Sequence, residues 1–92
     1  MANLTVYKYE VLLIDDVIID LPEGAKVLTF QAQNEVPCIW ALVDPNAAKV
    51  PRRFRLAGTG HLIQHDEKSL RYVGTAQFHE GALVFHLFEV LQ

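Results

Sequence analysis

The closing segment of the chain, Leu70–Gln92, constrains the fold most because it predicts a hairpin whose last strand is apolar on both faces. With a period of two, one side of that strand carries Leu83, Phe85 and Leu87, and the other side carries Ala82, Val84, Phe88 and Val90. A strand that faced water on one side would alternate apolar and polar residues. We therefore expect this strand to be covered twice, by its own core and by a second layer or a second subunit.

The rest of the chain also predicts short strands between frequent turns. Pro22-Glu23-Gly24 combines a fixed φ with a residue that tolerates positive φ, which is typical of a tight turn. We expect about seven strands in an all-β fold, a small antiparallel β-sandwich or barrel that forms a single domain over residues 1–92. The strands are predicted at Leu4–Ile14, Val17–Leu21, Lys26–Gln33, Cys38–Val43, Arg52–Ala57, Arg71–His79 and Ala82–Leu91, the last two around a two-residue turn at Glu80-Gly81.

Size and composition favour self-association. A chain of 92 residues buries only about 60–65% of its unfolded surface, so its own core gives modest stability. Its hydrophobic fraction of 51% exceeds the roughly 45–50% of an average domain. We therefore expect a homo-oligomer, most simply a dimer, formed through the outer side of the last strand at Val84, His86, Phe88 and Val90.

Charge, cysteine content and hydropathy exclude several classes of protein. A net charge of −3 argues against a nucleic-acid partner, because such domains are usually basic. The single Cys38 lies in an apolar run and is expected to be a buried thiol in a reducing compartment. Met1-Ala2-Asn3 does not open a signal peptide, and no apolar run approaches the ~20 residues of a membrane span. A cytoplasmic protein without a membrane partner is predicted.

The glycine pair in Gly58-Thr59-Gly60-His61 is the nearest approach to a ligand-binding motif. Glycines let backbone N–H groups approach a phosphate or carboxylate closely. Known phosphate loops lead into a helix, however, and no helix of useful length is predicted here. A tight bend between two strands explains the glycines equally well.

Charged residues are clustered along the chain. Four of the eight basic side chains, Lys49, Arg52, Arg53 and Arg55, fall within seven residues, and Asp15, Asp16, Asp20 and Glu23 form a contrasting acidic stretch. Such patches are often solvated or paired with each other. Alternatively, Arg53 and Arg55 lie on the outer face of one strand and meet an acidic surface or a phosphate-bearing ligand.

No combination of residues predicts catalysis, and we expect no enzyme activity, cofactor or metal. His61, His65 and Asp66 offer ligand types for zinc or iron, but i,i+4 spacing brings such side chains together only on a helix. Cys38 lies in a predicted core strand, where a reactive thiolate is disfavoured. Asp15 and Asp16 are neighbours in a turn and are expected to point apart.

The order of motifs resembles a family of short, uncharacterised phage and bacterial proteins. The resemblance covers about Tyr7 to Glu89 and rests on Leu21–Leu28 (LPEGAKVL), Gln33-Asn34, Val36–Asp44 (VPCIWALVD), Gly58–His61 (GTGH), Arg71–Thr75 (RYVGT) and Gly81–Glu89 (GALVFHLFE). It implies an accessory product of a phage or prophage and transfers no catalytic residue to this chain.

These observations together favour a non-catalytic binding protein. We expect it to dock on a host protein, for example as an inhibitor of a host defence process. A first alternative is a small-ligand or nucleotide-sequestering protein that uses Gly58–His61 with Arg53 or Arg55. Further alternatives are a minor virion or assembly component and a metal-dependent hydrolase built on His61, His65 and Asp66.

Overall fold

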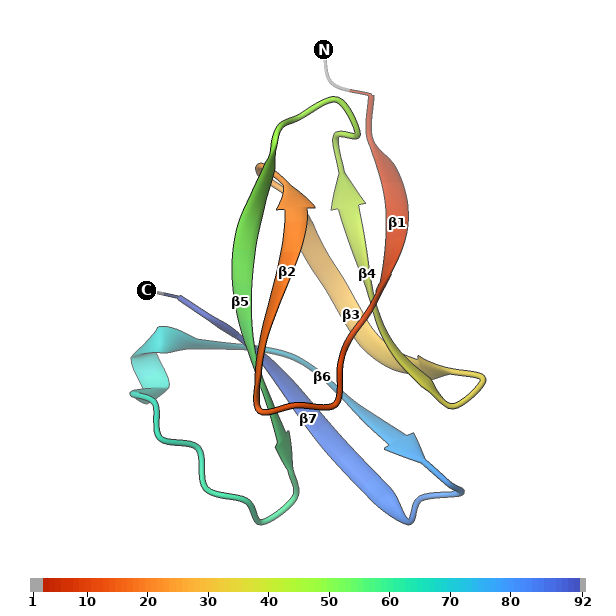
Figure 1. The fold of residues 1–92 in the computed structure, drawn as a ribbon, viewed down its shortest axis with the longest axis vertical. Coiled ribbons are helices and arrows are strands. Elements are labelled where there is room, and N and C mark those ends of the chain that lie inside the picture. Colours follow the sequence, from red (N-terminus) through yellow and green to blue (C-terminus); the bar gives the residue numbers. More distant parts are fainter. Residues whose placement is uncertain (1–2, 92) are drawn as a thin grey trace.

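The computed structural model describes residues 3–91 and shows seven strands in two antiparallel sheets (Figure 1). The predicted all-β sandwich is therefore confirmed. Three residues that the sequence analysis mentions lie outside the described residues. They are Met1 and Ala2, which were not expected to open a signal peptide, and Gln92, the expected end of the closing hairpin. The elements are β1 (Thr5–Glu10), β2 (Asp16–Pro22), β3 (Lys26–Gln33), β4 (Val36–Val43), β5 (Lys49–Gly58), the 3₁₀ turn η1 (Glu67–Ser69), β6 (Leu70–Phe78) and β7 (Leu83–Val90).

The two sheets share one hydrophobic core. The three-stranded sheet has the order β1-β4-β3, and the four-stranded sheet has the order β2-β5-β7-β6. The apolar run predicted at Cys38–Val43 forms the centre of the first sheet, because a strand with neighbours on both sides is buried along most of its length. The largest fully buried side chains are Phe30, Phe54, Leu21, Ile39 and Leu87, which come from both sheets.

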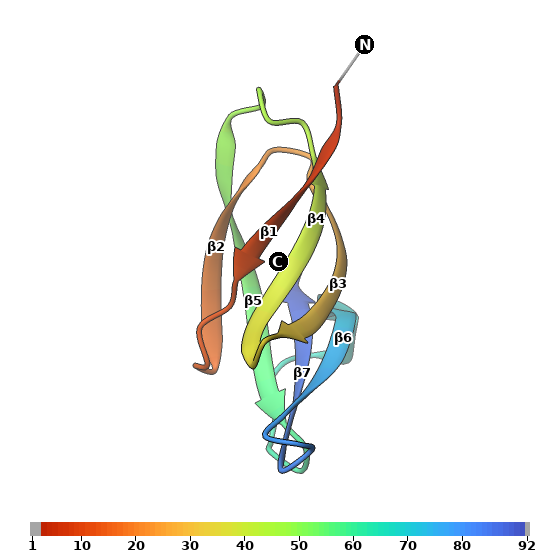
Figure 2. The ribbon, with the colours of Figure 1, turned by 90° about the vertical axis from the view of Figure 1, so that its right-hand side faces the viewer.

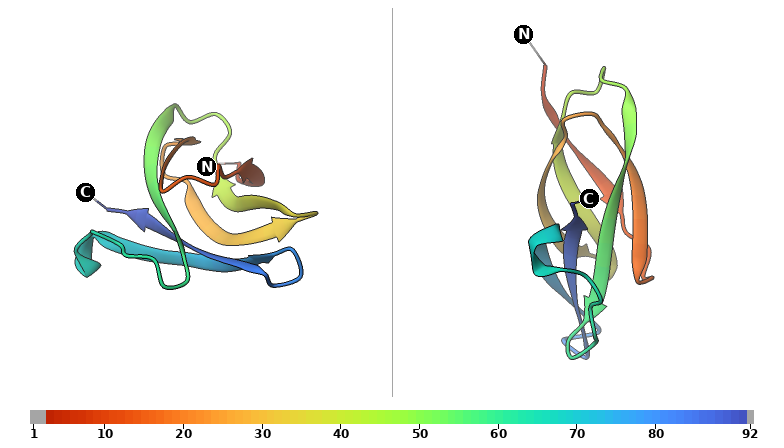
Figure 3. Two further views of the ribbon diagram at one scale, coloured as in Figure 1. Left: turned by 60° about the horizontal axis from the view of Figure 1, so that its bottom comes forward. Right: turned by 90° about the vertical axis from the view of Figure 1, so that its left-hand side faces the viewer.

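The sandwich is closed on one side and open on the other. On the closed side, β3 packs against β6, and a Cβ built on Gly74 would lie 3.0 Å from the carbonyl oxygen of Phe30. On the other side β1 and β2 are the free edges of their sheets, and no backbone pairing joins them (Figure 2). The chain connects these two edges through residues 11–15, as both views in Figure 3 show. Strand β1 thus ends at Glu10, four residues before the predicted end of the first strand.

Two sequence-based assignments of buried side chains are corrected. Strict alternation along Lys26–Gln33 assigns Leu28 to the inner face with Phe30 and Ala32, but Leu28 is 45% exposed, because a register shift between Val27 and Thr29 interrupts the alternation of β3. By residue type Trp40, a large aromatic residue in an apolar run, is assigned to the core or an interface. It is partly exposed, since Cys38, Trp40 and Leu42 project from the outer face of the three-stranded sheet, opposite the buried Ile39, Ala41 and Val43.

The last strand has one core face and one half-exposed face. Leu87 is fully buried, and Glu89 is buried beside it, whereas Leu83 at the start of the strand is 43% exposed. The opposite side, with Val84, His86, Phe88 and Val90, is partly exposed in the isolated chain. The preceding connection is longer than the predicted two-residue turn. It comprises residues 79–82, with positive φ at His79, Glu80 and Gly81.

Within residues 3–91 no helix is long and apolar enough to cross a membrane.

Candidate functional site

Arg55 is the most unusual charged residue of the predicted basic stretch, because it is buried. Residues Asp16–Arg55 and Ile18–Arg53 are cross-strand partners, so both arginines point to the outer face of the four-stranded sheet as predicted. Arg53 is exposed, but the connection from β5 to β6 covers Arg55. The Arg55 guanidinium donates to the carbonyl of Leu62 (2.9 Å) and to that of Leu56, and its Nη1 lies 3.4 Å from Asp15 Oδ1.

These contacts make Arg55 a connector between three segments. Its Nη1 and Nη2 groups donate to β5 itself, to the loop that carries Leu62, and to the β1–β2 connection at Asp15, whose carbonyl accepts at 3.3 Å. Arg55 therefore lies on the predicted outer face, but it is buried there. A guanidinium with these partners fixes the loop after β5 in place, and Arg53 is left as the exposed arginine of the stretch.

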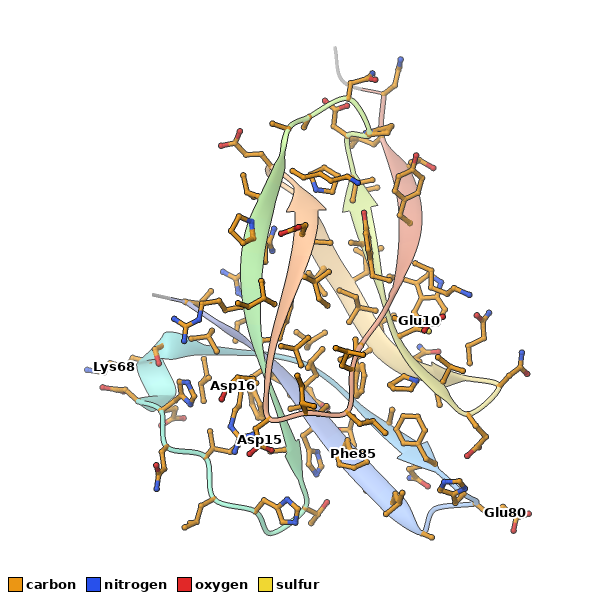
Figure 4. All side chains as sticks on the ribbon, viewed as in Figure 1. Glu10, Asp15, Asp16, Lys68, Glu80 and Phe85 are labelled. Atoms are coloured by element: carbon orange, nitrogen blue, oxygen red, sulfur yellow. The ribbon has the colours of Figure 1, made fainter. Side chains whose placement is uncertain are left out.

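A polar cavity of about 510 Å³ lies beside this connector. Figure 4 shows Asp15 and Asp16 at the end of β2 that faces the loop after β5. The cavity is lined by two carboxylates, two guanidiniums and three residues of that loop, namely Asp15, Asp16, Arg53, Arg55, Leu62, Gln64 and His65. His65 Nδ1 is buried and has no hydrogen-bond partner within residues 3–91. The mixture of charges suits a small polar ligand that carries both donors and acceptors.

The Gly58–His61 segment is a tight turn, which is the structural alternative considered from the sequence. The His61 N–H donates to the Gly58 carbonyl at 3.0 Å, and Gly60 has a φ of +88°, which favours glycine. The His61 ring covers Gly58, where an added Cβ would lie 2.9 Å from His61 Cε1. The geometry of the turn therefore explains why glycine is present at both position 58 and position 60.

The turn does not join the arginines. A second cavity, of about 340 Å³ and with mainly apolar walls, is lined by Gly58, Thr59, His61 and residues 82–85. Arg53 and Arg55 line the first cavity and not the second. The two halves of the predicted ligand site thus belong to separate cavities.

A chain of hydrogen bonds crosses the outer face of the four-stranded sheet. His86 Nε2 lies 2.7 Å from the hydroxyl of Thr59, and His86 Nδ1 lies 2.9 Å from that of Thr75. The Thr75 hydroxyl is in turn 2.6 Å from the Tyr72 hydroxyl. The ring of Tyr72 packs edge-on against Phe88, with centroids 5.7 Å apart. His86 is therefore held by two hydroxyls and joins the turn to β6.

The residues of the metal alternative are not assembled. His65 lines the first cavity and His61 the second, while Asp66 caps η1 by accepting from the Lys68 N–H at 2.9 Å. Within residues 3–91 no group of three His, Cys, Asp or Glu side chains is placed to hold a metal ion.

The third arginine of the basic stretch, Arg52, is paired inside the sandwich. It points to the inner face and forms a two-pronged ion pair with Glu89, with Nη2 3.0 Å from Oε1, and it also donates to the Ala25 carbonyl at 2.8 Å. Of Arg52, Arg53 and Arg55, only Arg53 forms neither a hydrogen bond nor an ion pair with another described residue.

The open side of the sandwich carries a concentration of exposed apolar side chains, which we call the edge surface. It consists of exposed residues just before and on β1, in the β1–β2 connection and on β2, with Val6 and Ile18 projecting from the outer faces of the two sheets on either side of the connection. These residues are Leu4, Val6, Tyr7, Leu12, Leu13, Ile14 and Ile18, each 44–67% exposed. Tyr7 points to the same side as the core, because its cross-strand partner Ala41 is fully buried. It is exposed because no strand covers that edge.

Sequence reasoning missed the edge surface, although a signal was present. The uninterrupted apolar run Val11–Ile14 precedes Asp15-Asp16 and was assigned to a long first strand. An apolar run that does not alternate fits a central strand, but this one has no partner strand after Val11, whose N–H donates to the Pro37 carbonyl at 2.9 Å. For the cavity, Gln64 gave no signal and His65 was considered only as a metal ligand, since only tertiary contact places these residues beside Asp15.

A family model describes this chain over almost its whole length. The match covers residues 2–92 and thus includes both sheets and both cavities. The chain belongs to DUF7352, a domain of unknown function. No curated protein and no solved structure matches it significantly.

Proposed function

We propose that this DUF7352 domain is a non-catalytic binding protein that docks on another protein through the edge surface. The observation that carries the proposal is the run of three consecutive exposed apolar side chains, Leu12, Leu13 and Ile14, between the two free edges β1 and β2. Single exposed apolar residues are common on soluble proteins, but several together at one place are typical of an interaction site.

The architecture of the open side supports the same function. The edges of β1 and β2 present unpaired backbone groups, and the connection between them presents Leu12, Leu13 and Ile14 at 52–66% exposure. Burial of these side chains by a partner removes apolar area from water at about 25 cal/mol per Å². A partner can thus gain both backbone hydrogen bonds and apolar burial at one place.

The proposed partner is a host protein, and the proposed setting is that of a phage or prophage accessory product, including an inhibitor of host defence. This part rests on the order of motifs between Tyr7 and Glu89. Within this setting the protein acts in the host cytoplasm. A role as a minor virion or assembly component uses the same surface and predicts that the protein copurifies with particles.

The test is capture of partners from host lysate by the tagged domain and by Leu13→Asp and Ile14→Asp variants. A charge in the exposed connection should abolish capture of any specific partner without loss of folding, checked by circular dichroism. Leu28→Asp is the matched control, because Leu28 is 45% exposed on β3, at the other edge of the three-stranded sheet. Equal capture by all four proteins would contradict the proposal.

A second candidate function, sequestration of a small polar ligand, is favoured by the cavity that contains Arg53, Asp16 and His65. It predicts a rise in Tm with particular nucleotides or other small polar metabolites. The rise should disappear in Arg53→Ala, which removes a cation that has no hydrogen bond or ion pair within residues 3–91, and persist in Lys49→Ala. Arg55→Ala is unsuitable, since loss of the connector would disturb the fold.

We also propose that two copies associate through the half-exposed side of β7, at Val84, His86, Phe88 and Val90. Tyr72, which is 59% exposed and packs on Phe88, enlarges this surface on the neighbouring strand β6. This surface lies on β7 and β6, on the outer face from which Ile18 of the edge surface also projects, but β5 separates it from β2.

A further inference from the structure

The free edge of β2 has a defined set of unpaired backbone groups. The Leu56 N–H donates to the Asp15 carbonyl at 2.9 Å, and the Glu23 N–H donates to the Ala48 carbonyl at 2.8 Å. In an antiparallel pair, successive residues direct their N–H and C=O groups alternately to the two sides. The N–H and C=O groups of residues 17, 19 and 21 therefore point toward β5. Those of Asp16, Ile18 and Asp20 point away from the sheet.

The side chains of the same three residues are exposed and form an acidic–apolar–acidic row. Ile18 is 67% exposed between the exposed carboxylates of Asp16 and Asp20. The next residue of this parity is Pro22, which has no N–H and ends the row of donors. Asp15 and Glu23 add further negative charge at the two ends of the strand.

Nearby cations only partly offset this charge. Arg55 lies beside Asp15 and is committed to the loop after β5. Across the sheet Arg53 faces Ile18 and Lys49 faces Pro22, so that with Arg55 three positive charges stand against the four carboxylates of Asp15, Asp16, Asp20 and Glu23. The strand itself carries no basic residue, so the edge retains a net negative charge.

A second copy of β2 does not fit this edge. The antiparallel arrangement that uses all three outward residues places Ile18 opposite its own copy and Asp16 opposite Asp20 twice. Like charges directly opposite each other destabilise a strand pair. The favoured occupant is therefore a strand of opposite charge from another protein.

We propose that the edge of β2 binds an extended basic segment of a partner protein by strand addition. The segment has the pattern basic–apolar–apolar–apolar–basic. Its basic residues lie opposite Asp20 and Asp16, its central residue lies opposite Ile18, and the two intervening residues point inward toward the open side of the sandwich. Main-chain hydrogen bonds contribute affinity, and the charges set register and specificity. The inference rests on the proposed protein-binding function and names the chemistry of its partner.

The probe is the capped peptide Ac-SRVVVRS-NH2, labelled for fluorescence anisotropy, with Ac-SEVVVES-NH2 as the charge-reversed control. The arginine peptide should bind the full chain with an affinity at least about tenfold higher, as two favourable cross-strand ion pairs predict. On binding, the backbone amides of Ile18 and Asp20 should become protected from hydrogen exchange. A third peptide, N-methylated at the central valine, should lose binding, because that position supplies the N–H for Ile18.

The matched variants separate the edge from general electrostatics. Asp16→Lys/Asp20→Lys should reverse the preference between the two peptides, whereas Glu67→Lys/Glu80→Lys changes the net charge equally at sites away from β2 and should leave it unchanged. Equal binding of the two charged peptides, or undiminished binding of the N-methylated one, would overturn the inference.

Failure of this inference is distinguishable from failure of the proposed function. If a lysate partner is lost in Leu13→Asp but retained in Asp16→Lys/Asp20→Lys, the edge surface binds protein without strand addition at β2. If neither set of variants changes capture, the proposed function itself is wrong.

Discussion

At the scale of single residues, burial in this protein depends on which elements lie above a side chain. Arg53 and Arg55 occupy equivalent positions two residues apart, yet only Arg55 is covered, because the loop after β5 accepts its hydrogen bonds. Cys38 is likewise buried although it points to the outer face of its sheet, where Glu10 and Gln31 are its cross-strand neighbours. The alternation of residues along a strand determines the face on which a side chain lies. The neighbouring strands and loops determine how exposed that side chain is.

The buried thiol predicts a loss of stability in alkali. Burial raises the pKa of Cys38 above its ordinary value of 9.0, the nearby Lys8 lowers it in part, and Glu10 raises it further. Above about pH 9 the unfolded chain has lost this proton while the folded chain still binds it, so the free energy of unfolding falls as pH rises. Urea unfolding at a series of pH values should show this fall.

Comparison with Cys38→Ala isolates the thiol, because Tyr9 has a raised pKa of the same cause and contributes the same sign near pH 10. The alanine variant should show a shallower decline between about pH 8 and 10. Identical declines in the two proteins would show that the thiol is not responsible. The thiol should also react with a disulfide reagent only after unfolding.

At the scale of elements, contacts across the sheets hold the strands in register. The Arg52–Glu89 pair joins β5 to β7 inside the sandwich, with side-chain exposures of 19% and 6%. Gly74 in β6 permits close approach to the backbone of Phe30 in β3. Neither the Arg52–Glu89 pair nor the Gly74 contact is part of a candidate binding surface. Substitutions at these positions therefore test the fold independently of function.

Removal of one partner of the buried pair should be costly. Glu89→Ala leaves Arg52 without its carboxylate and is expected to lower the free energy of unfolding by about 3 kcal/mol. Arg52→Met/Glu89→Leu removes both charges and should recover most of that loss. Urea denaturation of the two variants is the measurement, and a double variant less stable than Glu89→Ala would contradict the account.

Substitution of the two close-packed glycines should have unequal effects. Gly74→Ala places a methyl group against the Phe30 backbone, which cannot move aside, and should destabilise by about 1–3 kcal/mol. Gly58→Ala meets only the His61 ring, an exposed side chain that can rotate away, and should have the smaller effect. Thermal unfolding of both variants checks the order.

At the scale of the whole molecule, the sandwich leaves one side uncovered. Strand β3 packs against β6 on one side, whereas β1 and β2 remain unpaired free edges on the other. Exposed apolar groups on a small domain favour association, and the two surfaces described above lie on different parts of the sandwich. Their roles can therefore be separated by substitution.

The proposed dimer predicts a specific response to Phe88→Lys. A charge on the outer side of β7 should convert a dimer to a monomer in size-exclusion chromatography with light scattering, because a desolvated lysine without a partner disfavours the interface. Leu13→Asp, on the edge surface, should leave the mass unchanged. A monomeric parent protein at high concentration would remove this proposal.

Much of the fold follows from local pattern. The alternation of Phe54 and Leu56 with Arg53 and Arg55 predicted Arg52–Ala57, the greater part of β5, and the apolar run after Pro37 predicted most of the central β4. Leu28 escaped the pattern because a bulge shifts its register, and Trp40 because the outer face of its sheet stays uncovered. A local period carries no information on what lies above a sheet.

The candidate site divides in the same way. Arg53, Asp16 and the glycine turn could be singled out from residue type, since charge and backbone freedom are properties of the residues themselves. Their separation into two cavities, the burial of Arg55 and the open edge of β2 depend on contacts between segments that are distant in sequence. The sequence by itself determined strands, turns and one shared core, because side-chain periodicity and turn chemistry are local. Only the tertiary structure decided which edges remain free, because pairing of strands is a long-range choice.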